Sequence, residues 1–504
     1  MTTEVELKYL VLNENVAQRI VELLNVHQLP FTHQVKQLSN CYYDTADLAL
    51  RQLDMGLRIR IDGGAIEQTI KTAGQVVGGL HQRPEYNVAM TNAFPELSLF
   101  PDNIWPEVTK VDKLQAELIP LFNTDFTREL WQVSFADSEI ELVFDQGEIS
   151  SSGEQLAIFE IELELISGNR GDLFALAQLL FSTLSLRAGT ESKAARGYQL
   201  FFKQRRPSTT VSLDIQAASD NIQRYFLSGI DSCLQKLQQV IADYLQTKKL
   251  TKLAEFVDIL SLLRHGFWLF EQHLTDNTQE LRAEISHFIQ LFAWVDNAIY
   301  LRELMNKTGN YRKKLEYSEQ LIQRLKLEKS HFPDYLMVKQ LLHSERFNQL
   351  QLSLLVLVVD GNSSNYFSQQ ASAGSVTEFA KTKLSDSLIA LEKEVVKVDN
   401  LNAEQYLAQR KMLHRSLLTG HWFGELFNEQ SRAEFRIPWL DIKMGLRELQ
   451  SLWIIKQQLE KLDERNEPEI QKIIRWQQSK VENLLTALSH SKTAALALPA
   501  YWLS

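Results

Sequence analysis

Residues 159–165 read Phe-Glu-Ile-Glu-Leu-Glu-Leu, an alternation of apolar and acidic side chains. Because neighbouring side chains of a β-strand point to opposite faces, Glu160, Glu162 and Glu164 share one face and the apolar residues share the other. Like charges stacked on one strand face repel one another unless a cation lies among them. This stretch therefore predicts a strand with one acidic face and one apolar face.

Other stretches among the first 200 residues repeat this arrangement. Glu4, Glu6 and Lys8 share one strand face, and Arg58 and Arg60 share another. The remaining charged positions on alternating stretches are Lys71, Arg83, Glu85, Arg128, Glu141 and Asp145. Each stretch alone is typical of an antiparallel sheet with one solvated face. Together, clustered carboxylates need a cation and clustered guanidinium groups need an anion, so a metal-bound polyanion would meet both needs.

The alternating stretches predict an eight-stranded antiparallel barrel or a strongly curved sheet. They lie at residues 3–12, 38–44, 55–62, 65–72, 82–90, 127–135, 138–146 and 157–166. Helical spacing is predicted at 14–25, 112–121 and 170–184, and a hairpin turn at Asp62-Gly63-Gly64. If the charged face points inward, the interior is a polar tunnel, and helices or a partner subunit must cover the apolar outer face.

The second part of the chain is predicted to be helical. Leu, Ile and Phe recur at helical spacing beyond residue 215, while Gly and Pro are scarce. The basic, Pro-containing stretch 203–210 predicts a linker, and 361–375, rich in Gly, Ser and Asn, predicts a break between two sub-bundles. We therefore expect an α+β protein with a tunnel domain at 1–203 and an all-helical domain at 215–504.

Charge and cysteine content limit the class of protein. Residues 1–205 carry 17 Lys and Arg against 28 Asp and Glu, within a chain of net charge −10. This acidic balance argues against nucleic acid as a partner and suits divalent cations. No apolar run approaches the roughly 18 residues of a membrane span, and the first residues do not resemble a signal peptide. With only Cys41 and Cys233, we expect a cytoplasmic protein without a membrane partner.

The series of charged stretches resembles the CYTH family, also called triphosphate tunnel metalloenzymes. Glu4-x-Glu6-x-Lys8 is similar to that family's N-terminal signature, and further similarities follow in order to residue 200. They are Asn40-Cys-Tyr-Tyr-Asp-Thr45, Met55-Gly-Leu-Arg-Ile-Arg60, Lys71, Gly78-Gly-Leu-His-Gln-Arg-Pro-Glu-Tyr-Asn87, Arg128, Asp145-Gln-Gly147, Glu160-x-Glu162 and Ser192-Lys-Ala-Ala-Arg-Gly-Tyr198. The longer stretches are similar to those of bacterial inorganic triphosphatases that carry a C-terminal CHAD domain.

The resemblance implies a tunnel that hydrolyses inorganic triphosphate with two divalent ions, Mg²⁺ or Mn²⁺. It implies metal ligands at Glu4, Glu6, Asp145, Glu160, Glu162 and Glu164. It implies a phosphate path lined by Lys8, Arg58, Arg60, Lys71, Arg83, Arg128, Lys193 and Arg196, the last two on a helix that plugs the tunnel end. Lys8 and Glu162 are the expected catalytic residues, and the group that takes the proton from the attacking water stays open.

Other functions remain as alternatives. Related tunnels imply thiamine or nucleoside triphosphatase or adenylate cyclase activity, and a non-catalytic polyphosphate-binding protein is a further alternative. The sequence contains no phosphate loop, nucleophile elbow or His-Glu-x-x-His motif. The helical part resembles the CHAD domain, which implies polyphosphate as a partner. Its basic rows are thinned to Arg264, His265, Lys411, His414, Arg415 and His421, so docking or scaffolding is the other expectation.

Overall fold

The computed structural model describes residues 2–203, 210–216, 219–309, 311–361, 365–368, 374–395, 401–462 and 467–503. The chain forms two compact units. Unit 1 contains residues 1–209 with 339–355, and unit 2 contains residues 210–338 with 356–504. Most of the predicted linker, at 204–209, lies outside the described residues, and so do 362–364 and 369–373 of the predicted break.

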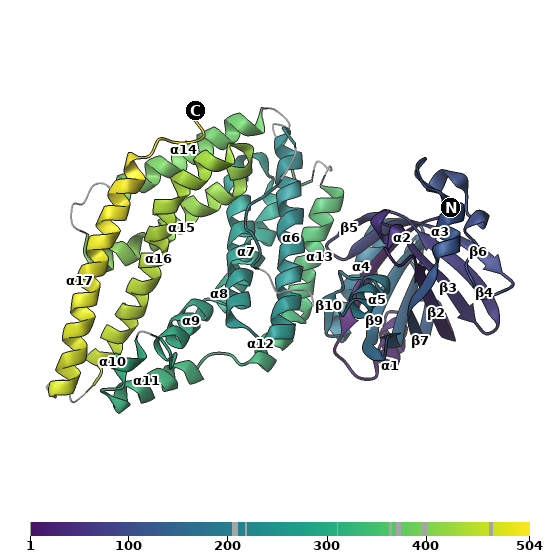
Figure 1. Ribbon diagram of the computed structural model, residues 1–504, viewed down its shortest axis with the longest axis horizontal. Coiled ribbons are helices and arrows are strands. Elements are labelled where there is room, and N and C mark those ends of the chain that lie inside the picture. Colours follow the sequence, from purple (N-terminus) through teal and green to yellow (C-terminus); the bar gives the residue numbers. More distant parts are fainter. Residues whose placement is uncertain are drawn as a thin grey trace. The chain divides into compact units, whose positions relative to one another are not determined.

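Eight antiparallel strands of unit 1 close into a barrel, which confirms the predicted fold class (Figure 1). They are β1 (Thr2–Val11), β2 (Phe31–Asp44), β3 (Gly56–Asp62), β4 (Ala65–Lys71), β6 (Leu80–Met90), β7 (Ile119–Phe135), β8 (Ser138–Ser151) and β9 (Glu154–Ser167). The order around the ring is β1-β9-β8-β7-β2-β3-β4-β6, and the pairing of β6 with β1 closes it. Two short strands, β5 (Gln75–Val77) and β10 (Leu186–Ala188), pair with β6 and β1.

Several element boundaries differ from the sequence-based expectation, most of all the starts of β2 and β7 and the end of β8, which were predicted at residues 38, 127 and 146. Strand β2 begins at Phe31 rather than at residue 38. The sequence pattern did not predict the first seven residues of the strand, because residues 31–37 are mostly exposed and carry no apolar face. The predicted helix at 112–121 ends at Glu117, and β7 begins at Ile119. Pro120 explains this change, because proline lacks an amide hydrogen and disfavours helical geometry in the residue before it.

The outward face of the barrel is apolar and is covered by helices. Leu57, Ile59 and Ile70 pack against Leu50 and Leu114, which come from two short helices. The helices of unit 1 are α1 (Val16–Val26), α2 (Ala49–Gln52), η1 (Leu97–Leu99), η2 (Asp102–Ile104), α3 (Val111–Glu117), α4 (Arg170–Thr183) and α5 (Lys193–Phe201). Burial of each large apolar side chain contributes about 1.5–3 kcal/mol, so these contacts stabilise a barrel that keeps its charges inside.

The interior of the barrel changes character near α5. Leu38, Ile149 and Ile158 point inward there and pack with Phe126 and with Tyr198 of α5. The neighbouring inward positions carry charged side chains and line a cavity. The barrel is therefore a tunnel that combines an apolar plug under α5 with a charged middle section.

Unit 2 is helical. Its described elements, with α12 and α13 shared between the two units, are α6 (Ile222–Thr247), α7 (Leu250–Leu269), η3 (Glu271–His273), η4 (Asp276–Thr278), α8 (Gln279–Leu291), α9 (Trp294–Leu304), α10 (Arg312–Leu315), α11 (Glu319–Ser330), α12 (Tyr335–Leu342), α13 (Glu345–Asp360), α14 (Val376–Val395), α15 (Ala403–Phe423), η5 (Gly424–Leu426), α16 (Glu429–Glu460) and α17 (Pro468–Ala497). One of its cores joins α9, α11, α16 and α17 through Leu301, Leu325, Leu452 and Ile473. Among the helices of the described ranges, none combines the length and hydropathy needed to span a membrane.

Candidate active site

The charged interior of unit 1 surrounds a cavity of about 260 Å³. All eight strands of the ring and the start of α5 contribute side chains to its wall. Among the sequence-predicted site residues, the wall includes Glu4, Glu6, Lys8, Arg58, Arg60, Lys71, Arg83, Arg128, Glu162, Glu164 and Lys193. The other three, Asp145, Glu160 and Arg196, lie behind the wall, where they contact residues that line the cavity or one another.

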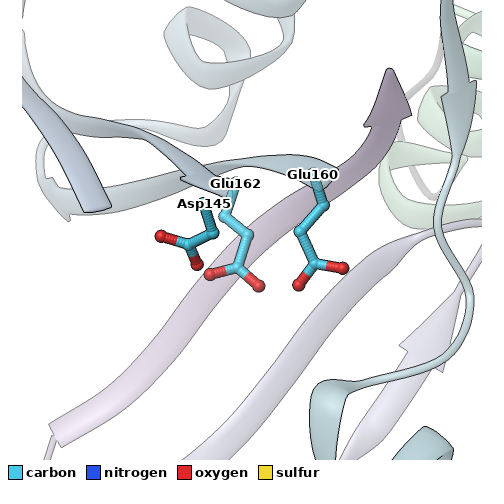
Figure 2. A group of neighbouring side chains, drawn as sticks. All are labelled: Asp145, Glu160 and Glu162. Carbon is cyan, nitrogen blue, oxygen red and sulfur yellow. The ribbon is translucent and has the colours of Figure 1, made fainter. Parts of the chain in front are cut away.

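Three carboxylates, those of Asp145, Glu160 and Glu162, lie close together (Figure 2). Asp145 on β8 lies opposite Glu160 on β9, and Glu162 follows two residues later on the same face. One oxygen from each lies within 4.8 Å of the others, so this acidic triad could hold a metal ion. Carboxylate oxygens are the ligands that Mg²⁺ and Ca²⁺ prefer.

Basic side chains already neutralise the acidic triad. Lys193 Nζ lies 2.7 Å from Asp145 Oδ2 and 2.5 Å from Glu160 Oε1. The same ammonium group lies 3.0 Å from Glu162 Oε1. Lys8 Nζ adds contacts of 2.7 Å to Glu162 Oε1 and 3.4 Å to Glu160 Oε1. The ammonium group of Lys193 thus occupies the position of a tethered cation among the three carboxylates.

Two arginines complete this neutralisation. Arg128 donates from Nε and Nη2 to the two oxygens of Asp145, at 2.7 Å each, in a bidentate pair. Its Nη2 also lies 3.1 Å from Glu162 Oε2. Arg196 on α5 donates from Nη2 to Glu160. Bidentate guanidinium–carboxylate pairs are among the stronger charge-assisted hydrogen bonds, so the triad is rigidly held.

The protonation states of the acidic triad and of Lys8 follow from their contacts. Burial alone would raise the pKa of Asp145, Glu160 and Glu162, but the nearby charge of Lys193, reinforced by the other basic groups, holds all three below their usual range. Burial would lower the pKa of Lys8, yet the charges of Glu160 and Glu162 raise it above its usual value. Lys8 therefore remains a cation at neutral pH.

A second acidic group occupies the rest of the cavity and is short of cations. Its members are Glu4, Glu6, Glu85, Glu141 and Glu164. Lys71 contacts Glu4 and lies 3.2 Å from Glu85 Oε2, and Arg58 Nη2 lies 3.3 Å from Glu85 Oε1. Within the described ranges, Glu6, Glu141 and Glu164 have no ion pair.

The pKa values show the same deficit of positive charge. Burial, with contributions from Glu6 and Glu85, raises the pKa of Glu4 to about 7 despite Lys71. Burial and neighbouring carboxylates raise the pKa of Glu164 to about 8. A divalent cation would remove this penalty, because it neutralises clustered carboxylates. The chemistry of the second acidic group therefore suits a metal ion better than that of the acidic triad, which has cations of its own.

Two arginines of the cavity have no anionic partner among the described residues. Arg60 Nε donates to Asn40 Oδ1 at 2.9 Å, and burial together with Arg58 and Arg128 lowers its pKa to about 9. The Nε of Arg83 is buried without a hydrogen-bond partner in the part of the chain that the structure describes. A ligand with several negative oxygens would satisfy both guanidinium groups.

Several polar residues of the wall were not predicted as site residues, among them Glu85, His81 and Asn40. Glu85 shares its strand face with Arg83, a signal that was visible in the sequence, and it binds Lys71 and Arg58. His81 lies on the same face, and its ring contacts Gly189 O at 3.3 Å. Burial lowers the pKa of His81, so its ring is neutral. Asn40 accepts a hydrogen bond from Arg60. It lies in the stretch 40–45, which resembles the CYTH family but has no alternating charges that would mark Asn40 as a site residue.

The thinned basic rows of unit 2 have internal partners. His265 Nε2 lies 2.8 Å from Thr419 Oγ1. His421 Nδ1 lies 2.6 Å from Asp214 Oδ1, and Arg436 Nη1 lies 3.1 Å from the same oxygen. Burial lowers the pKa of His421 and favours its neutral form. These contacts give both histidines a place in the packing of the helices.

The barrel and its interior together define a class of protein. An eight-stranded tunnel gathers carboxylates and guanidinium groups around one cavity, and these groups have the chemistry to bind a cation and a polyanion. Residues 2–198 match the CYTH domain family and residues 228–460 match the CHAD domain family, so the chain contains a CYTH domain followed by a CHAD domain.

Individual proteins are similar to parts of the chain. The chain is 40% identical over 210 residues to an inorganic triphosphatase of Haemophilus influenzae. The matched region covers 40% of this chain and 56% of the length of that protein. A Hippeastrum structure described as having a dominant triphosphatase activity is 18% identical, covers 40% of this chain and 98% of its own, and has a TM-score of 0.30. The CHAD domain of Ricinus communis is 15% identical, with coverages of 58% and 96% and a TM-score of 0.41.

Proposed function

We propose that the protein is a metal-dependent inorganic triphosphatase that converts triphosphate to pyrophosphate and phosphate inside the tunnel. One observation carries the proposal: the same cavity holds carboxylates short of cations and guanidinium groups without an anion. A metal–triphosphate complex would satisfy both sets at once. The similarity of the CYTH domain to a protein named inorganic triphosphatase supports this choice of substrate.

The basic side chains of the tunnel bind and orient the substrate in this proposal. Arg60 and Arg83 have no carboxylate partner in the described part of the chain, so we expect them to bind phosphate oxygens. Arg58, Lys71 and Arg128 add positive charge around the same space. Phosphoryl transfer depends mainly on positioning and on charge neutralisation, because triphosphate carries about four negative charges and the transition state spreads them over its oxygens.

The acidic side chains hold the metal in this proposal. Glu4, Glu6 and Glu164 are the first choice among the predicted ligands, because they lack the four basic partners of the acidic triad. Mg²⁺ or Mn²⁺, in two sites, would supply Lewis-acid polarisation and a more acidic bound water. Asp145 and Glu160 hold the basic residues of α5 and β7 in place.

Lys8 and Glu162 take complementary parts. Lys8 keeps its charge because Glu160 and Glu162 raise its pKa, so it stabilises negative charge and does not act as a base. Glu162 orients Lys8 at 2.7 Å and Arg128 at 3.1 Å. Because these cations and Lys193 depress the pKa of Glu162, it is a weak proton acceptor and serves as an electrostatic anchor.

A substrate panel tests the proposal. Phosphate and pyrophosphate release would be measured from tripolyphosphate, ATP and thiamine triphosphate, with Mg²⁺ and with chelator. We expect turnover of tripolyphosphate that needs the metal. A preference for ATP or thiamine triphosphate would reassign the substrate, pyrophosphate release from ATP would indicate a cyclase, and affinity without turnover would indicate a polyphosphate-binding protein.

Glu6→Ala tests the assignment of the second acidic group. Loss of a charge-stabilising group costs on the order of 10²–10³ in rate, so metal-dependent turnover should fall by this factor in a folded protein. Lys113→Met is the control, because Lys113 forms an exposed pair with Glu117 at 3.7 Å, outside the cavity. Normal phosphate release from folded Glu6→Ala would contradict the proposal.

A further inference from the structure

Two buried side chains that do not line the cavity contact one another where α5 meets the end of β2. They are Asp44, the last residue of β2, and Tyr198 on α5. The hydroxyl of Tyr198 donates a hydrogen bond to Asp44 Oδ2 at 3.0 Å. Both side chains are buried, with exposed fractions of 0% for Asp44 and 4% for Tyr198. A buried carboxylate that accepts a phenol hydrogen bond ties the two elements together strongly.

Asp44 is a fixed anchor. Its Oδ1 accepts from the backbone amides of Thr45 at 2.7 Å and Leu50 at 2.9 Å, and its Oδ2 accepts from that of Arg51 at 3.1 Å. Three backbone donors therefore set the position of the carboxylate within the turn between β2 and α2. The hydrogen bond from Tyr198 joins α5 to this turn.

The ring of Tyr198 is held from its sides as well. Phe122 on β7 meets it edge-on, with centroids 5.3 Å apart, and the guanidinium of Arg51 lies 4.5 Å from the ring centroid. Burial and the charge of Asp44 raise the pKa of Tyr198, so the hydroxyl keeps the proton that it donates. The neighbouring Gly197 packs closely against Phe122, because a Cβ on Gly197 would lie 2.1 Å from the Phe122 ring.

The other part of α5 carries the cations of the acidic triad. Lys193 is the first residue of this nine-residue helix, and Arg196 lies one turn further on. Lys193 contacts all three carboxylates and also lines the cavity, while Arg196 contacts Glu160. Because a helix this short moves as one body, a shift at Tyr198 would displace the ammonium group that neutralises the triad.

We propose that Asp44 and Tyr198 are positioning residues. Their hydrogen bond holds α5 so that Lys193 and Arg196 stay in contact with the acidic triad and neutralise it, which favours binding of triphosphate in the tunnel. The inference rests on the proposed function for its kinetic consequence. It adds a role for two residues that reach the substrate only through other side chains.

Tyr198→Phe tests the inference, because it removes the hydroxyl and keeps the ring. We expect the KM for tripolyphosphate to rise by about tenfold, the scale of one hydrogen bond to a charged group. We expect kcat to change much less, since a displaced cation weakens binding of substrate and transition state alike. Tyr43→Phe is the matched control, because its hydroxyl donates to Ala93 O at 3.3 Å on the outward face of the barrel.

The same substitution in a Lys193→Met background separates positioning from general packing. If Tyr198 acts through Lys193, the further rise in KM should be small, since the cation is already gone. Arg196→Gln serves as a second background if Lys193→Met does not fold. The inference would be overturned if Tyr198→Phe raised KM as much in the Lys193→Met or Arg196→Gln background as in the wild type. An unchanged KM in folded Tyr198→Phe would also overturn it.

Hydrogen exchange of the full-length protein gives a readout independent of turnover. We expect the amides of α5 to exchange faster in Tyr198→Phe than in the wild type, with β8 and β9 unchanged. Unchanged exchange in α5 would refute the positioning role even if the protein hydrolyses triphosphate. A wild type without triphosphatase activity would refute the proposed function, while the exchange measurement would still decide whether the hydrogen bond holds α5.

Discussion

Replacing Lys193 by Met should lower the stability of the protein, because the acidic triad loses the cation that contacts all three of its carboxylates. Met keeps a similar length and removes the ammonium group, which has three carboxylate partners at 2.5–3.0 Å. The side chain is 8% exposed, so water does not take its place readily. Breaking a buried ion pair by removing one partner costs about 3–5 kcal/mol. For a unit of this size, that is a fall of roughly 6–20 °C in the midpoint of thermal unfolding.

The loss should depend on pH in a defined direction. In the wild type, the pKa values of Asp145, Glu160 and Glu162 lie below their usual range, so their stabilisation is complete above about pH 4 and is lost as pH falls through the folded values. Without Lys193, we expect burial to raise these pKa values above the unfolded ones. A carboxyl whose folded pKa exceeds its unfolded value loses stability as pH rises, so the variant should be most impaired near pH 8 and least near about pH 5.

Scanning calorimetry of the full chain in chelator, at about pH 5 and about pH 8, measures this effect. Added Mg²⁺ should restore part of the loss near pH 8, since a cation can then enter among the freed carboxylates. Lys113→Met is the control, because its exposed pair contributes about 1 kcal/mol at most. Unfolding of Lys193→Met at the temperature of this control at both pH values would contradict a stabilising role of the Lys193 ion pairs.

Three further substitutions test other parts of the tunnel. Glu164→Gln should raise the thermal midpoint in chelator, and most of all above about pH 8. The raised pKa of Glu164 lowers the stability of the wild type progressively as pH rises from the ordinary carboxyl pKa to about 8, and calorimetry against pH measures this. Arg60→Gln should raise the thermal midpoint without substrate, because burial and the charges of Arg58 and Arg128 disfavour the charge of Arg60 and lower its pKa to about 9. The same substitution should raise the KM for tripolyphosphate in steady-state kinetics. Gly197→Ala should lower stability by about 1–3 kcal/mol in a urea titration, because its methyl group would meet the neighbouring Phe ring of β7.

Each of these predictions has an outcome that contradicts it. An unchanged pH profile for Glu164→Gln would mean that Glu164 is already neutralised by a group other than a metal. A less stable Arg60→Gln would show that Arg60 supports the fold and is not held ready for an anion. A Gly197→Ala protein as stable as the wild type would show that α5 can move away from β7 at little cost.

The amino-acid sequence by itself determined which side chains share a strand face. Strict alternation at Glu160, Glu162 and Glu164 leaves no other arrangement on a strand, and the apolar positions between them required a covered outer face. The outer core around Leu57 confirms that cover. The sequence did not reveal the start of β2, because residues 31–37 have no apolar face to mark it.

Only the tertiary structure decided that the charged face points inward and which charges meet. An alternating strand is compatible with a solvated face or a tunnel, since local spacing is identical in both. Closure of β1 against β6 and β9 makes the difference, because it brings Lys8 to Glu162. Likewise, Tyr198 and Asp44 meet because α5 packs against the barrel, a contact across 154 positions that no local pattern encodes. Side-chain alternation is a property of neighbouring residues, whereas ring closure depends on pairing distant strands.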